Sequence, residues 1–183
     1  MSVIEYILLA FALAVPTMVT VRGCAVKNPI RLTRGLGVSF LIALEHTLLL
    51  LAGILVGNLL RFDIPDYDNL IYLGMLVIVA GRMFFMAFSK KEKPSYDIAS
   101  WPTVLLLGVA TGINSLFVGL GLGFRVLVEN ELWKVGIHLI VVIFLFAYLG
   151  IMLGRRKKQV RVRRWMLLGM LFLLIFAVKG AFF

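Results

Sequence analysis

The chain has 183 residues, 62% of them hydrophobic, and its mean hydropathy is +1.03. A soluble domain of this length cannot bury so much apolar surface in one core. The formal net charge of +10 would suit a nucleic-acid-binding protein. The basic residues, however, cluster between apolar runs, where cytoplasmic retention explains them, so no nucleic-acid partner is expected. A single cysteine, Cys24, excludes an internal disulfide.

Six apolar runs follow one another along the chain, each long enough for a tilted helix to cross about 30 Å of hydrocarbon. They cover residues 4–21, 35–60, 70–88, 102–126, 132–153 and 165–183. The first run has neither a basic leader nor an A-x-A pattern, so a cleavable signal peptide is not expected. The runs predict an all-α integral membrane protein with six transmembrane helices in one domain, 1–183, whose first partner is the lipid bilayer.

The loops predict the orientation, because Lys and Arg are retained on the cytoplasmic side. Loops one, three and five carry most of the basic residues: Arg22, Lys27, Arg31, Arg34, Lys90, Lys91, Lys93, Arg155, Arg156, Lys157, Lys158, Arg161, Arg163 and Arg164. Loop two instead carries Asp63, Asp66 and Asp68 around Pro65. The odd loops are therefore expected in the cytoplasm of a bacterial inner membrane, with both termini outside. The basic run 155–164 is interpreted as a topology anchor.

The first and fourth runs resemble each other at an offset of 98 residues. The matched pairs are Ala12 with Ala110, Thr17 with Ser115, and Gly23 with Gly121. Three crossings separate the copies, so the pattern predicts inverted repeats over residues 1–88 and 102–183, joined by a cytoplasmic loop at 89–101. Pro16 and the glycines of the fourth run weaken both helices at mid-depth. Close packing and formation of a substrate site both explain these breakers.

Glu45 and His46 lie near the centre of the second run, where an ionisable group is costly unless it faces a partner or water. At 100° per residue, one narrow stripe of this helix is small and polar. It contains Gly35, Ser39, His46, Gly53 and Gly57. His46 is therefore expected to face the protein interior with Glu45 beside it. An interhelical hydrogen bond and an ion-binding role are both open to His46.

Polar residues of three other runs are further candidates. Ser115 shares a glycine-rich stripe of the fourth run, with Thr111 at its edge, whereas Asn114 lies off that stripe in a regular helix. Arg82, deep in the third run, could pair with Glu45 or extend toward the headgroups. His138 is interpreted as structural.

Short motifs along the whole chain resemble the bacterial manganese efflux pump family (MntP type), a branch of the LysE-like transporters. They are residues 8–11 (LLAF), 81–83 (GRM), 110–111 (AT) with 118–122 (VGLGL), 149–150 (LG) with 154–155 (GR), and Lys179. The resemblance implies aspartates in the first and fourth spans that serve the metal path. Pro16 and Asn114 stand at those positions here, and the polar position of the second span falls on His46. The chain thus resembles a divergent member of the family.

The predicted function is a secondary transporter, not an enzyme, that moves a small divalent cation out of the cytoplasm. The predicted ion path contains Glu45, His46, Asn114, Ser115, Thr17 and Thr111, with Arg82 as a gating counter-charge. Glu45, His46 and Asn114 are the candidate metal ligands, and no cofactor is expected besides a transported cation such as Mn²⁺. The alternative is a transport-inactive relative that serves a larger membrane complex as an accessory subunit. A membrane-protein partner or a homodimer is compatible with either function.

Overall fold

The computed structural model describes residues 3–61, 67–89, 96–124, 129–157 and 162–182. Within these ranges the regular structure is helical throughout, which confirms the predicted all-α class. The helices are α1 (Val3–Lys27), α2 (Leu32–Arg61), α3 (Asp68–Phe88), α4 (Trp101–Phe124), α5 (Glu129–Arg155) and α6 (Val162–Phe182).

The helix boundaries depart from the predicted runs mainly at the basic ends. α1 continues six residues past the predicted end, to Lys27, because Cys24 and Ala25 remain buried in the bundle. Hydropathy predicts only the lipid-buried segment of a helix, whereas the end of the helix also depends on its packing against the rest of the bundle. α4 stops at Phe124, so the predicted residue Val126 lies outside the described residues, as do Asp63, Pro65 and Asp66 of loop two.

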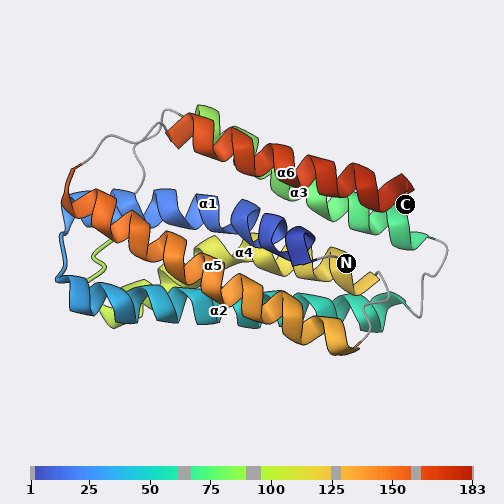
Figure 1. Ribbon diagram of the computed structural model, residues 1–183, viewed down its shortest axis with the longest axis horizontal. Coiled ribbons are helices and arrows are strands. Elements are labelled where there is room, and N and C mark those ends of the chain that lie inside the picture. The colour runs from blue at the N-terminus through green and yellow to red at the C-terminus, as the bar shows by residue number, and fades with distance from the viewer. Residues whose placement is uncertain (1–2, 62–66, 90–95, 125–128, 158–161, 183) are drawn as a thin grey trace.

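The helices form three layers of two (Figure 1). α3 pairs with α6 in one outer layer, and α2 pairs with α5 in the other. α1 and α4 lie between them, where α4 packs on α2 and α3 while α1 packs on α5 and α6. The first residues of α1 and the last of α6 lie toward one end of the bundle, and the C-terminal ends of α1, α3 and α5 lie at the other (Figure 1).

The helices of the first half, α1 to α3, and those of the second half, α4 to α6, pack in equivalent pairs. The α2–α4 pair corresponds to the α5–α1 pair, and α3–α4 corresponds to α6–α1. Individual glycines follow the same rule: Gly53 of α2 lies against the carbonyl of Leu116, and Gly150 of α5 lies against the carbonyl of Met18. Leu116 and Met18 are 98 positions apart, which is the offset of the sequence repeat. These equivalences support the predicted inverted repeat.

The contact between α2 and α4 is made through glycines on both helices. A Cβ added at Gly53 or Gly119 would collide with the backbone of the opposite helix, and Gly57 and Gly123 are similarly close to each other. Small residues of this kind let transmembrane helices approach until their backbones touch. The packing interpretation of the fourth-run glycines therefore holds for Gly119 and Gly123.

The expectation of weakened helices is not met at Pro16, because α1 is continuous from Val3 to Lys27. Proline lacks the N–H that would bond the carbonyl of Ala12, four residues earlier. That carbonyl instead lies 3.3 Å from the position a Cβ would occupy on Gly169 of α6. α4 is likewise continuous through its glycines. Tight neighbouring helices keep both segments helical.

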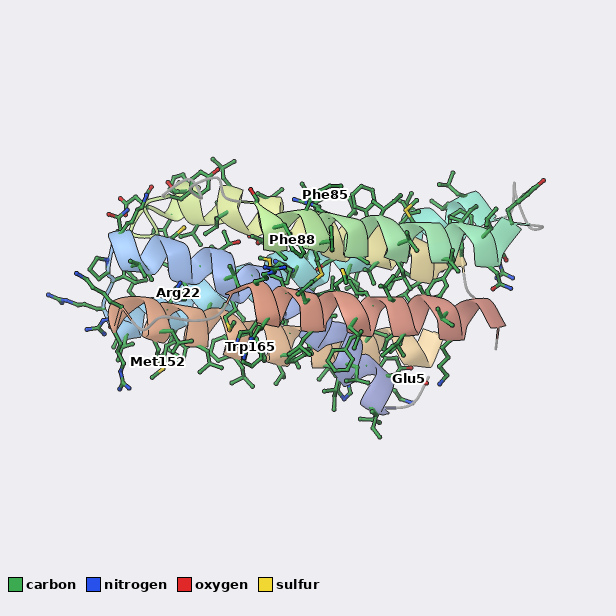
Figure 2. The ribbon with its side chains drawn as sticks, turned by 90° about the horizontal axis from the view of Figure 1, so that it is seen from above. Glu5, Arg22, Phe85, Phe88, Met152 and Trp165 are labelled. Carbon is green, nitrogen blue, oxygen red and sulfur yellow. The ribbon has the colours of Figure 1, made fainter. Side chains whose placement is uncertain are left out.

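Within the described residues, five helices, α1 to α5, are long and apolar enough to cross a membrane. Their outer faces carry exposed apolar side chains, such as Phe85 and Phe88 on the outer side of α3 (Figure 2). α6 has 21 residues, about 31 Å at 1.5 Å per residue, with Arg163 and Lys179 near its two ends. A sixth crossing stays a prediction that this length supports.

Replacing Gly119 with alanine should destabilise the bundle, because the new methyl group meets the backbone of Leu50 and α2 must move away. We expect the free energy of unfolding in detergent to fall by about 1–3 kcal/mol. Gly74→Ala is the matched control, since a Cβ there has no neighbour within 4 Å. That control should be neutral or slightly stabilising, because alanine favours helix over glycine by up to about 1 kcal/mol. Equal stability of the two variants would contradict the tight α2–α4 contact.

Candidate functional site

His46 lies at the centre of a hydrogen-bond network that joins three helices. Its side chain is fully buried, and its Nδ1 lies 2.9 Å from the hydroxyl of Ser115 on α4. Its Nε2 lies 3.0 Å from the hydroxyl of Thr111 on α4 and 3.3 Å from that of Thr17 on α1. The structure therefore brings together four of the predicted site residues from α1, α2 and α4.

The proton positions in this network follow from the bonds that the hydroxyls make to their own helices. Thr111 donates its hydroxyl hydrogen to the carbonyl of Leu107, at 2.9 Å. Its oxygen is then free to accept from Nε2–H of His46, and Nδ1 accepts from the hydroxyl of Ser115. This arrangement assigns the Nε2–H tautomer to a neutral ring. Both ring nitrogens of His46 therefore have a hydrogen-bond partner inside the bundle.

Thr17 and Ser115 are one of the pairs matched at the offset of 98 residues, and both contact the same imidazole. His46 therefore lies where the two predicted halves meet. Any movement of one half relative to the other changes the environment of this ring.

Glu45 is buried beside His46 but lacks its partners. Its side chain is 9% exposed, and neither carboxylate oxygen has a hydrogen-bond partner among the residues that the structure describes. The carboxylate lies against the backbone of Gly108 on α4, so closely that a Cβ there would overlap Oε2. An acid at this depth without a partner is costly and marks a functional position.

Arg82 does not bind Glu45, which was one of its two expected roles. Its Nη1 donates to Oδ1 of Asn114, at 2.9 Å, and its Nη2 approaches the carbonyl of Ala110, at 3.4 Å. Asn114 thus faces α3, which is consistent with its place off the glycine stripe of a regular α4. The hydrogen bond between Arg82 and Asn114 is thus a polar contact separate from the hydrogen-bond network of His46.

The predicted metal set of Glu45, His46 and Asn114 combines an acid and an imidazole of α2 with an amide of α4. In the part of the chain that the structure describes, no three His, Cys, Asp or Glu side chains come together at one point. Ligation by these three residues therefore stays a prediction. Sequence analysis also missed the contact between Gly108 and Glu45, because the two residues are distant in the chain.

His138 contacts its own helix and α1. Its Nδ1 donates to the carbonyl of Lys134, at 2.6 Å, and its ring lies 5.8 Å from that of Tyr6. These contacts agree with the structural role predicted for it.

Apolar helices with exposed apolar faces around a buried polar network define a multi-pass membrane protein. A family model described as "Putative manganese efflux pump" matches residues 29–180, and the chain belongs to this family of transporters.

Relatives that carry the name of putative manganese efflux pump align over most of the chain. The protein of Syntrophotalea carbinolica is 30% identical over 162 residues, which cover 85% of this chain and 83% of the relative. That of Aliarcobacter butzleri is 24% identical over 178 residues, covering 96% and 97%. One from Wolinella succinogenes is 24% identical over 156 residues, covering 85% and 84%. No solved structure matches the chain.

Replacing His46 with leucine, which keeps much of the side-chain volume, should remove the contacts that join α1, α2 and α4. Interhelical hydrogen bonds in membrane proteins contribute about 0.6 kcal/mol each on average. We therefore expect the free energy of unfolding to fall by about 1–2 kcal/mol. Thr47→Val is the control, because the Thr47 hydroxyl donates to the carbonyl of Ala43 in its own helix, at 2.9 Å. A smaller loss for His46→Leu than for this control would be inconsistent with an interhelical role.

Proposed function

We propose that the chain is a secondary transporter that moves a small divalent cation, with manganese as the first candidate, out of the cytoplasm. The observation that carries the proposal is the buried carboxylate of Glu45, which precedes His46 in α2 and has no hydrogen-bond partner in the described part of the chain. The relatives' names supply the candidate cation and the direction.

The chemistry of Glu45 suits a hard divalent cation. Mn²⁺ prefers carboxylate and neutral oxygen ligands, and a carboxylate at membrane depth offsets the loss of the ion's hydration. A carboxylate can bind either the cation or a proton, so Glu45 could exchange one for the other during a cycle. Alternating access would come from movement of one half of the bundle against the other.

Arg82 and Asn114 adjust the charge of the same region. Asn114 stands where the family resemblance places an aspartate, and Arg82 donates to its amide oxygen. One carboxylate and one nearby guanidinium leave the interior close to neutral when no cation is bound. In the proposed cycle Arg82 is a counter-charge that prevents tight retention of the cation. Membership of a transporter family does not favour the accessory-subunit alternative.

Glu45→Gln tests the proposal directly, because the amide keeps the shape of the side chain and removes its charge. In a strain that lacks its own manganese exporter, the wild-type chain should lower cellular manganese and restore growth in excess manganese. Glu45→Gln should abolish both effects. Manganese content by elemental mass spectrometry is the measurement.

The control for this experiment is Glu5→Gln, which removes the carboxylate that pairs with Lys179 near the chain ends. Because this pair lies away from His46, the control should export manganese like the wild type. Unchanged manganese in cells that express the wild-type chain would refute the proposed function. Full export by Glu45→Gln would refute the role of Glu45.

We also propose that the protein lies in the bacterial inner membrane with both termini outside. The end of the bundle opposite the termini carries basic residues such as Arg31, Arg34 and Arg156, and such residues are retained in the cytoplasm. A periplasm-active phosphatase fused after the C-terminus should therefore be active, and one fused after Arg156 should be inactive. The reverse pattern would contradict the orientation.

A further inference from the structure

We propose that Gly108 is a positioning residue, whose missing side chain forms the recess on α4 that holds the Glu45 carboxylate inside the bundle. The inference rests on the proposed role of Glu45 in transport. Nothing in the family resemblance or the relatives' names assigns a role to Gly108.

The recess follows from the geometry of α2 and α4. These helices are in contact along their glycines, so the carboxylate of Glu45 meets the α4 backbone directly. A Cβ at Gly108 would overlap Oε2 of Glu45 and would stand 2.6 Å from its carboxyl carbon. The space of that Cβ is therefore the space that the carboxylate occupies.

Gly108 differs in this respect from the glycines that hold the two helices together. At Gly53 and Gly119 a Cβ would meet backbone atoms, which can move only if the helices separate. At Gly108 it would meet the end of a side chain with rotatable bonds. Alanine at position 108 should therefore displace the carboxylate and leave the bundle folded.

Displacement matters because no hydrogen bond from the described residues holds the Glu45 carboxylate. Its position therefore depends on packing, which includes the close contact with Gly108 of α4. His46 is held differently, through hydroxyls of Thr17, Thr111 and Ser115. A residue larger than glycine at 108 would thus displace the carboxylate from α4, whereas the hydrogen bonds of His46 go to other residues.

The test compares Gly108→Ala with Gly74→Ala, whose Cβ has no neighbour within 4 Å. Both purified variants should be monodisperse and melt within a few degrees of the wild type. Gly108→Ala should lose at least about tenfold in manganese transport into inverted vesicles, since displacement of a reacting group by about 1 Å can lower rates by roughly a hundredfold in enzymes. Gly74→Ala should transport normally.

A second measurement reports on the carboxylate without depending on transport. Dicyclohexylcarbodiimide modifies carboxyl groups within membranes, and mass spectrometry gives its rate of addition to Glu45. That rate should rise in Gly108→Ala, because the carboxylate has left its recess. In a Glu45→Asp background, where the acid is one methylene shorter, Gly108→Ala should change the rate of addition to residue 45 little.

The outcomes separate this inference from the proposed function. Unchanged transport in Gly108→Ala, an unchanged labelling rate, or failure of this variant to fold would each overturn the positioning role. The positioning role would also be overturned if Gly108→Ala raised the labelling rate of residue 45 as much in the Glu45→Asp background as in the wild type. Faster labelling in Gly108→Ala together with no manganese transport by the wild type would refute the proposed function. It would still support the inference that Gly108 positions the Glu45 carboxylate.

Discussion

The close approach of α2 and α4 is the constraint on which the rest of this structure depends. Gly53 and Gly119 allow the two backbones to touch, because neither carries a side chain at the crossing. In a membrane there is little hydrophobic gain from joining two apolar helices, so close packing must supply much of the stabilisation. The same approach places the polar face of α2 directly against α4. The site is therefore a consequence of the packing.

His46 and Glu45, which are neighbours in α2, differ in whether the α2–α4 contact gives them hydrogen-bond partners. His46 is fully buried and satisfied by hydroxyls on both central helices, so it stabilises the meeting of the two halves. Glu45 is nearly as buried, and within the described ranges neither of its carboxylate oxygens has a hydrogen-bond partner. Buried polar groups without partners are destabilising, and proteins tend to retain them where they serve a function. This contrast is the reason why the proposed ion exchange is placed on the acid and not on the imidazole.

Pro16 and Asn114, which stand where the family resemblance implies aspartates, can be understood in the same terms. Pro16 is accommodated inside a continuous α1, where the carbonyl of Ala12 lies against Gly169. Asn114 accepts a hydrogen bond from Arg82. A neutral amide suffices for that contact, so the loss of a carboxylate at this position leaves no unpaired guanidinium. In the proposed function Glu45 supplies the acidic group of the site.

The sequence alone determined the class of the protein, because hydropathy and run length depend on composition and not on contacts. It also placed His46 and Ser115 on inward faces, since helical periodicity is a local property. It could not determine that Arg82 would bind Asn114, because that choice depends on how α3 lies against α4. The contact between Gly108 and Glu45 likewise required the packed structure, since it depends on the register of two helices whose residues lie more than sixty positions apart.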